Sequence, residues 1–389
     1  MRLFDRIFQG DRGIWMVAWI LALISLLCVY SATSVVAIKD YGGNNTFVLM
    51  KHAVFVVAAL VLMFVASRVK YTYYSNIFNM LFFVALVLLI LTQLLGTESN
   101  EARRSLSISK ILPFVSSKVS FMPNEFVKLI IIGYIARKIA LRKDNPDPGW
   151  KDICLNIMLP VISVMGLMIT ENLSTSLLIF ATCIAMMFVG NIKMKYIMSF
   201  VGIVVFFFAL FICVKYKTDS DGRHTTWKAR ISNIENYQKD CAKAAIATGG
   251  IFGKLPGKST ERNSLPKVAN DCIYAIVVEE YGLVGGVFVM SLYLILLYRV
   301  IMIMMKRPDS FGAILSFGLI LCIVMQAFIN IGVSVGMLPT TGQNLPFVSR
   351  GGTSMICTGI SFGIILSVTK DINKNDEKRK ELEQVQAAD

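Results

Sequence analysis

Three carboxylates stand close together in an otherwise apolar part of this 389-residue chain. Asp271 ends a long basic, glycine-rich segment, and Glu279 and Glu280 follow within the apolar run that begins at Cys272. A carboxylate at the centre of a membrane helix costs about 2.5–3.5 kcal/mol, so such residues usually face a cavity or a partner. A carboxylate can also take up a proton as a general base. The three acids therefore mark a candidate site, with Asp271 as its first residue.

A second group of charged residues combines cations with one acid. Arg103 and Arg104 precede the segment 122–128, where a proline at the expected helix start and Glu125 in the first turn both favour a helix. Glu125 and Lys128 are three residues apart, so they can neutralise each other on one helix face. One interpretation is a capped helix with an ion pair, and the other makes Arg103, Arg104 and Lys128 a cationic wall.

Glycine, lysine and serine gather in the segment 249–259, which reads Gly-Gly-Ile-Phe-Gly-Lys-Leu-Pro-Gly-Lys-Ser. Backbone N–H groups freed by glycine could hold an oxyanion there, beside Lys258. The segment is not a Walker A motif, because Phe252 stands where the first glycine of G-x-x-x-x-G-K-S would be. A flexible loop explains the same composition. A phosphate cradle and a flexible loop therefore stay as two hypotheses.

The segment 336–354 lies between the last two apolar runs and is rich in glycine, proline and polar residues. Irregular backbone at membrane depth is tolerated only where it is buried in protein or lines a cavity. We therefore expect a re-entrant loop here. Within it, Arg350 follows Ser349 and stands beside Gly351 and Gly352, which makes this stretch a candidate contact for an anion.

The elements that must position these residues are membrane helices. The chain is 55% hydrophobic with a mean hydropathy of +0.63, far above the level of a soluble domain. Its apolar runs are continuous and near or above the roughly 17–20 residues that span hydrocarbon, which favours helices over spanning strands. Ten runs are expected to span, namely 14–37, 47–67, 76–96, 124–141, 154–171, 174–191, 195–215, 272–300, 311–336 and 352–370. The predicted fold class is an all-α polytopic integral membrane protein with a single domain over 1–389.

The distribution of lysine and arginine predicts which way the spans run. Ten spans place both termini on one side, and the short loops on that side carry most of the cations, so we expect both termini in the cytoplasm. The first run is too long for a cleaved signal peptide and is read as a retained span. Asp271 then falls at the outer end of the eighth span. The charged tail 371–389 is expected to be disordered or frayed.

The outer loop before Asp271, residues 216–270, carries ten lysines and arginines against five acids. The cytoplasmic loops explain most of the net charge of +14, but long loops cross a membrane regardless of their charge. The basic character of this loop is therefore available for an anionic lipid headgroup or a pyrophosphate. Nucleic acid is not an expected partner outside the cytoplasm.

The cysteines and histidines show no pattern of a structural metal site and leave one possible disulfide open. The eight cysteines show no CxxC or zinc-like spacing, and there are only two histidines, so no structural metal site is expected. Cys241 and Cys272 could both face an oxidising compartment and pair. Their positions in the sequence do not decide whether they do.

These clusters, in this order, resemble the SEDS family (shape, elongation, division and sporulation). The resemblance covers nearly the whole chain, and ten spans with a large loop after the seventh is that family's layout. The motifs that are similar to the family's loop and eighth helix are Gly-Gly-x-x-Gly at 249–253, Leu265-Pro266, Asp271, Ala275 and Glu279-Glu280-x-Gly282-Leu283. Those similar to its final loop are Leu338-Pro339-x-Thr341-Gly342, Leu345-Pro346 and Ser349-x-Gly351-Gly352-x-Ser354.

The chain departs from the family pattern at three places. It has Met122-Pro123-Asn124-Glu125 where the family usually has Gln-Pro-Ser-Glu, Ala269-Asn270 where His-Thr often precedes the key Asp, and Arg350 where Tyr commonly precedes Gly-Gly. None of these departures removes a charged residue. The hairpin 171–175, Glu-Asn-Leu-Ser-Thr, is more similar to the division branch than to the elongation branch.

The resemblance implies peptidoglycan glycosyltransfer from lipid II, the undecaprenyl-pyrophosphate-linked disaccharide, in the bacterial cytoplasmic membrane. Asp271 would be the general base of an inverting transfer. Basic side chains or a divalent cation, Mg²⁺ or Mn²⁺, would meet the charge of the leaving pyrophosphate. The candidate substrate-binding cations are Arg103, Arg104, Lys128, Lys258 and Arg350. Glu125, Glu279 and Glu280 are interpreted as orienting or ion-pairing groups.

The family also implies partners and leaves rival functions open. A single-span class B penicillin-binding transpeptidase would dock on spans eight and nine, alongside other divisome proteins and membrane lipids. An elongation rather than a division role stays open. A lipid flippase or transporter would also use buried charges and a re-entrant loop, but alternating access needs a midplane site, whereas these clusters gather at one face. A non-catalytic scaffold would leave the aligned charges unexplained.

Overall fold

The computed structural model describes residues 8–33, 44–95, 97–99, 102–107, 120–142, 149–169, 172–218, 235–261, 271–306 and 310–386. The helices that run through the bundle are α2 (Arg12–Ala32), α4 (Asn45–Arg68), α5 (Tyr71–Leu95), α7 (Pro123–Ala140), α8 (Trp150–Ile153), α9 (Leu159–Ile169), α10 (Leu173–Val189), α11 (Met194–Thr218), α14 (Ile273–Met304), α15 (Phe311–Ser334) and α16 (Gly352–Gln386). A π-helical segment, η1 (Cys154–Met158), joins α8 to α9 without a break.

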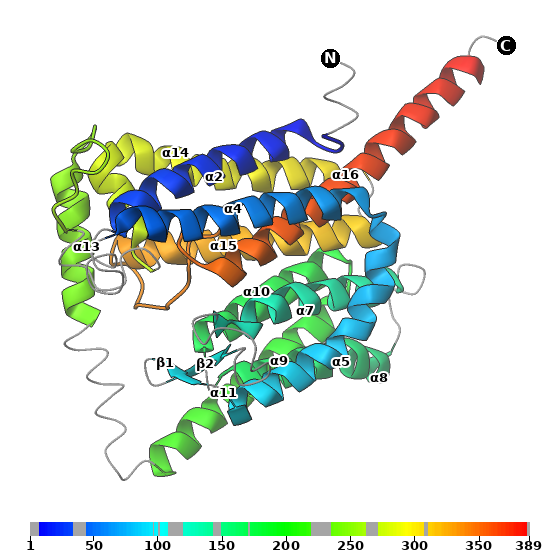
Figure 1. Ribbon diagram of the computed structural model, residues 1–389. Helices are drawn as coiled ribbons and strands as arrows, with labels where there is room; N and C mark the ends of the chain where they lie inside the picture. The colour runs from blue at the N-terminus through cyan, green and yellow to red at the C-terminus, as the bar shows by residue number, and fades with distance from the viewer. Residues whose placement is uncertain are drawn as a thin grey trace.

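Two groups of helices pack against each other in the bundle (Figure 1). One group contains α2, α4, α14, α15 and α16, and the other contains α5, α7, α8, α9, α10 and α11. Helix α15 lies at the seam, because it contacts α14 and α16 on one side and α7 and α10 on the other. Its most apolar stretch is 72% buried, the pattern of a central helix whose whole circumference is covered by protein.

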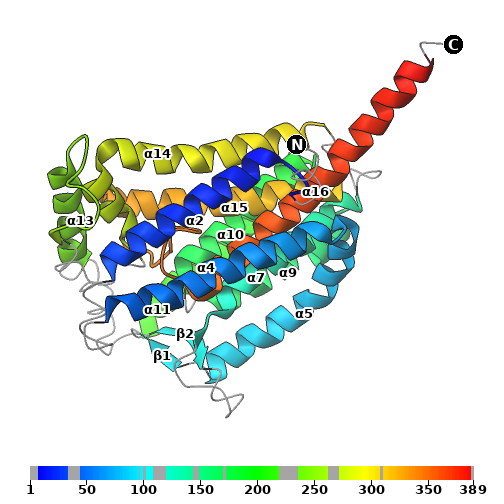
Figure 2. The ribbon, with the colours of Figure 1, turned by 45° about the horizontal axis from the view of Figure 1, so that its top comes forward.

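Both termini lie at one end of the bundle, and helix α13 (Glu235–Gly249) lies at the other (Figures 1 and 2). Helix α13 comes from the long basic loop, where the sequence analysis expects no helix. It packs against α14 and α15, with Ala242 and Ala245 buried against Ala275 and Ile276. Small alanine side chains let the helix backbones approach closely there.

A small antiparallel sheet precedes α7. Its strands are β1 (Thr97–Ser99), β2 (Ala102–Ser107) and β3 (Ser120–Phe121), in the order β1-β2-β3. The register pairs Thr97 with Ser105 and Leu106 with Phe121. Strand β3 leads directly into α7, so β2 lies next to the start of that helix. The sequence analysis expects no strands in this segment.

Seven helices of the described chain are long and apolar enough to cross a membrane. They are α2, α4, α5, the continuous unit Trp150–Ile169, α14, α15 and the Gly352–Lys374 part of α16. The other three expected spans also fall on helices: α7 has four charged residues among 18, α10 has 17 residues, and the apolar part of α11 is Met194–Leu210. The all-α membrane fold is therefore confirmed, whereas the count of ten spans stays a prediction.

The charged tail differs from its expectation. Helix α16 continues through it to Gln386 instead of fraying after residue 370. Residues 371–386 contain several Lys, Glu and Gln, which have high helix propensity, and they extend a helix that is already nucleated.

Candidate functional site

Asp271 lies directly before the first turn of α14, at the end of the bundle where α13 packs (Figure 1). It is half-buried, and its backbone carbonyl accepts a 2.9 Å hydrogen bond from Nδ2 of Asn330 on α15. The same amide nitrogen donates a 2.8 Å bond to the backbone carbonyl of Gln343 in the final loop. One buried side chain therefore holds Asp271 and the final loop in a fixed relation.

Gln326 repeats this arrangement one turn earlier on α15. Its Nε2 donates to the backbone carbonyl of Asn344 at 2.9 Å, and its Oε1 accepts from Nζ of Lys128 at 2.7 Å. Because Gln326 and Asn330 are four residues apart, they lie on the same face of the helix. This face of α15 therefore connects α7, the final loop and the start of α14.

Lys128 is 4% exposed and forms an ion pair with Glu125, with Nζ 3.0 Å from Oε2. The predicted pairing of these two residues is confirmed. An ammonium group has three N–H donors. Glu125 and Gln326 account for two of them, so one remains that a ligand could use. The neighbours of Lys128 thus orient its ammonium group but do not use all of its N–H donors.

Arg103 and Arg104 lie on strand β2, next to the start of α7. The backbone therefore brings the two arginines to the helix that carries Glu125 and Lys128. The side chains of Arg103 and Arg104 lie outside the described part of the structure, so the predicted cationic wall stays a prediction.

The final loop is buried between helices, as a re-entrant loop requires. Leu345, Phe347 and Val348 are almost fully buried. The hydroxyl of Tyr293 on α14 donates to the backbone carbonyl of Pro346 at 2.5 Å, and the hydroxyl of Ser25 on α2 donates to that of Val348 at 2.9 Å. Side chains from the surrounding helices therefore donate hydrogen bonds to carbonyl groups of the irregular backbone that have no backbone partner within the described ranges.

The predicted substrate contacts in this loop have structural partners or close neighbours. The hydroxyl of Ser349 accepts a 2.8 Å bond from the backbone N–H of Leu345. A Cβ atom at Gly351 would lie 2.9 Å from Nδ2 of Asn344, and one at Gly352 would lie 2.8 Å from the ring of Phe55, so both glycines permit close packing. Arg350 is half-buried beside them.

Glu279 is fully buried and holds the segment before residue 262 against α14. Its carboxylate pairs with Nζ of Lys254 at 2.9 Å and accepts bonds from the hydroxyl of Ser259 and from the N–H of Thr260 at 2.9 Å. The predicted ion-pairing character of Glu279 is confirmed. Glu280 is also buried and accepts a bond from the hydroxyl of Ser31 on α2.

The glycine-rich loop packs on a break in α14 at Gly282, whose φ is +72°. The N–H groups of Lys254 and Leu255 donate to the carbonyls of Glu279 and Glu280 at 2.9 and 3.0 Å, and the N–H of Leu283 donates to the carbonyl of Gly250 at 2.9 Å. The loop thereby supplies partners for backbone groups that a continuous helix would have satisfied internally.

The oxyanion-cradle hypothesis for this loop needs correction, whereas the flexible-loop hypothesis stays a prediction. The N–H groups of Gly253, Lys254, Leu255 and Lys258 donate to backbone carbonyls, so they do not form an oxyanion cradle. The glycines serve close approach instead, because a Cβ atom at Gly282 would overlap the carbonyl of Ile251. The loop is a packed element, and Lys258 lies exposed on it.

Cys241 and Cys272 lie in the same small buried cluster between α13 and the start of α14. Both are free thiols in the structure. Cys272 is 3% exposed. Its burial shields the thiol from reagents in solution while the chain is folded.

Among the described residues, no three His, Cys, Asp or Glu side chains gather as a metal site. Mg²⁺ is commonly held by one or two carboxylates together with substrate phosphates. Asp271 could contribute one such carboxylate. A divalent cation at the pyrophosphate therefore stays a prediction.

Sequence reasoning missed the residues that hold the site together. Gln326 and Asn330 interrupt an apolar span at helical spacing, which is the signal that could have found them. Gln343 donates to the hydroxyl of Thr175 at 2.6 Å, and Tyr293 donates to the carbonyl of Pro346. Neither residue carries a comparable signal in the sequence, because its partner is distant along the chain.

Comparison with known proteins identifies the family. The model of the family described as "Cell cycle protein" and named for FtsW, RodA and SpoVE matches residues 11–374. Stage V sporulation protein E of Bacillus subtilis (strain 168) is 28% identical over 92% of this chain and 97% of its own length. A probable peptidoglycan glycosyltransferase FtsW of Coxiella burnetii is 30% identical over 91% of this chain and 95% of its own length.

A solved structure shares the fold. A chain from a study of how a peptidoglycan synthase complex coordinates polymerization and crosslinking superposes with a TM-score of 0.71 at 22% identity, over 93% of this chain and 98% of that one. The family model and the relatives cover the same long stretch that carries the site motifs. The chain therefore belongs to the FtsW, RodA and SpoVE family, the SEDS proteins.

Proposed function

We propose that this chain is a peptidoglycan glycosyltransferase that polymerises lipid II, with Asp271 as its general base. The observation that carries the proposal is the position of Asp271. Its backbone is fixed by Asn330, on the same helix face that orients Lys128 through Gln326. The relative named probable peptidoglycan glycosyltransferase FtsW supports the reaction class.

In the proposed reaction a sugar hydroxyl of one lipid-linked saccharide attacks the anomeric carbon of another. The C–O bond to the lipid pyrophosphate breaks as the new glycosidic bond forms, and the hydroxyl proton passes to the carboxylate of Asp271. A positioned base of this kind typically accelerates the reaction by about 10²–10⁴-fold. A single displacement inverts the anomeric configuration and needs no covalent intermediate.

The departing pyrophosphate needs cations near the same end of the bundle. Lys128 has one N–H donor left after its bonds to Glu125 and Gln326. Arg103 and Arg104 are proposed to join it, because β2 lies beside the start of α7. Arg350 and Lys258 complete the proposed set from the final loop and the glycine-rich loop. Electrostatic contacts of this type are each worth about 2.7–4 kcal/mol when removed from comparable sites.

The proposed partner is a single-span class B penicillin-binding transpeptidase, with other divisome proteins nearby. The solved structure with the same fold comes from a complex that coordinates polymerization and crosslinking, which supports a partner of this kind. Of the two expected docking helices, α14 offers the apolar surface: its most apolar stretch is 33% buried, against 72% for α15. The docking residues would be exposed side chains of α14, such as Val287, Phe288 and Tyr298.

We further propose a multi-pass location in the bacterial cytoplasmic membrane with both termini cytoplasmic. The start of α2 and the end of α16 lie at one end of the bundle and the start of α14 at the other, which supports placing the termini and Asp271 on opposite sides of the membrane (Figure 1). A septal, division-linked role is proposed from the hairpin that begins at Glu171, a residue outside the described part of the structure. Localising a tagged chain to midcell or to the sidewall would decide between division and elongation.

The function can be tested by reconstituting the purified chain in liposomes and supplying lipid II from outside. A polymerase converts this lipid II into glycan strands that are resolved on a gel. A flippase moves the labelled lipid between leaflets without making any polymer, and a scaffold does neither. Translocation without polymer would overturn the proposed function.

A further inference from the structure

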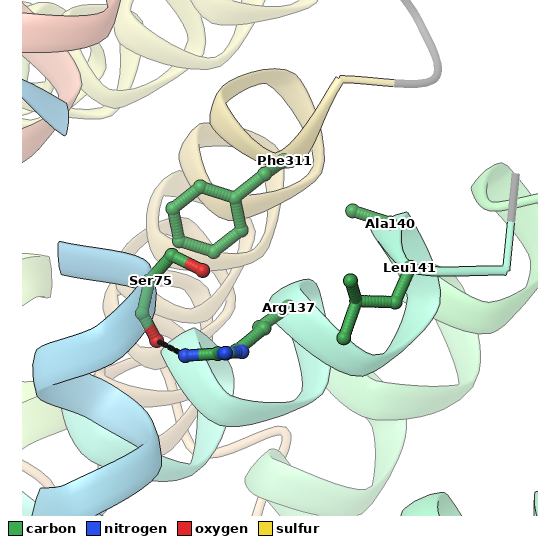
Figure 3. Close-up of a pocket in the computed structure, with 5 residues that line it drawn as sticks. All are labelled: Ser75, Arg137, Ala140, Leu141 and Phe311. Atoms are coloured by element: carbon green, nitrogen blue, oxygen red, sulfur yellow. Dashed lines mark hydrogen bonds between the residues drawn. The ribbon is translucent and has the colours of Figure 1, made fainter. Parts of the chain in front are cut away.

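A cavity of about 250 Å³ lies at the end of the bundle that carries the termini (Figure 3). It is lined by Ser75, Arg137, Ala140, Leu141 and Phe311. These residues come from the early turns of α5 and α15 and from the last turn of α7. Phe311 and Asn330 are nineteen positions apart on α15, about 28 Å at 1.5 Å per residue, so the cavity is remote from Asp271.

Arg137 gives this cavity an oriented positive charge. A single nitrogen, Nη1, donates both to the backbone carbonyl of Ser75 at 2.6 Å and to Oδ1 of Asn76 at 2.8 Å. Figure 3 shows the guanidinium group reaching across to Ser75. The N–H groups on Nε and Nη2 have no partner within the described part of the chain. They keep three of the five guanidinium donors for a ligand.

The neighbouring cations are engaged differently. Arg142 pairs with Asp152, with Nε 2.5 Å from Oδ2, and Lys138 donates to Oδ1 of Asn156 at 3.1 Å. For Arg137 the structure records no carboxylate partner in the described ranges. A guanidinium whose open edge has parallel N–H groups matches two oxygens of a phosphate. The first turns of α5 and α15 add the positive ends of two helix dipoles, and the last turn of α7 adds the negative end of a third.

The rest of the cavity is apolar and opens to the bundle surface. Leu141 is 69% exposed at its rim, and the ring of Phe311 stacks on Tyr71 with centroids 6.4 Å apart. An apolar wall beside one cation matches an amphiphile rather than a sugar. The volume is also below the roughly 300–1,000 Å³ of pockets for drug-sized ligands, which favours a headgroup fragment over a disaccharide.

We propose that this cavity binds the phosphate of an anionic glycerophospholipid. Arg137 holds two phosphate oxygens, and Ala140, Leu141 and Phe311 contact the glycerol and the first acyl carbons. Helix ends of membrane spans lie at the depth of lipid phosphates, and basic pockets between spans bind anionic headgroups. The site is independent of the proposed glycosyltransfer, because it lies at the opposite end of the bundle.

Native mass spectrometry of the purified full-length chain tests the proposal. The chain is titrated with phosphatidylglycerol and, separately, with phosphatidylcholine carrying the same acyl chains. We expect preferential retention of one phosphatidylglycerol and a loss of affinity of about tenfold in Arg137→Gln, the size expected for a charge-assisted bond. Lys151→Gln is the matched control, because it removes an equal charge from an exposed position on α8 at the same end.

A second variant tests the cavity without changing charge. Ala140→Leu fills the space beside Arg137 and should weaken phosphatidylglycerol binding while thermal unfolding shows an intact fold. Inorganic phosphate is added in a separate arm, and it should compete only weakly because it lacks the glycerol and acyl contacts. The proposal is overturned if Lys151→Gln and Arg137→Gln weaken binding equally, if Ala140→Leu binds like wild type, or if phosphate or phosphatidylcholine binds as well as phosphatidylglycerol.

Discussion

The side-chain amide of Asn330 donates to the backbone carbonyl of Asp271 across 2.9 Å, and with the same nitrogen it holds Gln343 in the final loop. The candidate base is therefore positioned by α15, the central helix of the bundle, rather than by its own helix alone. Small displacements of reacting groups can cost about 10²-fold in rate. The relation between these two residues should therefore matter for catalysis although Asn330 need not touch substrate.

Asn330→Ala tests this positioning role. We expect lipid II polymerisation to fall about 10–100-fold, mainly in kcat, because Asp271 loses its backbone anchor while the substrate contacts remain. Asn156→Ala is the control: it removes a half-buried amide at the opposite end of the bundle, where Nδ2 of Asn156 donates to Oδ1 of Asp152 at 2.7 Å. A purely structural role for Asn330 would instead lower the melting temperature and leave kcat of the folded fraction unchanged.

Lys128→Met should destabilise the chain, because it leaves Glu125 without its cation. Loss of one partner from a buried pair costs about 3–5 kcal/mol, and the low end applies because the side chain of Glu125 is 16% exposed. The double variant Lys128→Met with Glu125→Gln should recover most of this stability without recovering polymerisation. Thermal unfolding and polymer yield, measured on the same preparations, separate the two effects. Full activity in the double variant would show that Lys128 has no part in the reaction.

Gly282→Ala should release the glycine-rich loop from α14. A Cβ atom at this position would overlap the backbone carbonyl of Ile251, so the loop must move. We expect faster tryptic cleavage after Lys254 and Lys258 and a lower melting temperature. Gly257→Ala is the matched control, since its φ is also positive at +77° but a Cβ atom there meets nothing within 4 Å. Its cost should be about 1–2 kcal/mol from backbone conformation alone. Equal cleavage rates in both variants would contradict the packing explanation.

Cys272 should resist alkylation in the folded chain at pH 8. Its thiol is buried, with the residue 3% exposed, so an alkylating reagent cannot reach it while the chain is folded. Labelling should become fast once the chain is unfolded in detergent. Mass spectrometry under non-reducing conditions should find Cys241 and Cys272 as two free thiols, and a disulfide between them would contradict the structure described above.

The sequence predicted the parts of the site that depend on local patterns. The apolar runs located the helices, and the three-residue spacing located the Glu125–Lys128 pair. The glycine-rich loop was misread because composition cannot tell a glycine that frees an amide from one that admits a neighbouring backbone. The break at Gly282 and its partner at Ile251 meet only in the folded chain. Asn330 and Gln326 were visible as polar residues in a span, but their partners on three other segments were not.

The most direct test of Asp271 as the general base is to measure lipid II polymerisation by the Asp271→Asn variant. The variant keeps the size of the side chain and removes its basicity, so folding and membrane insertion should be intact. Asp240→Asn, an exposed acid on α13 at the same end of the bundle, is the control. We predict a fall of about 10²-fold or more in glycan strand synthesis for Asp271→Asn and none for Asp240→Asn. Glycan strands made at the wild-type rate by the purified Asp271→Asn variant would contradict the assignment of Asp271 as the base.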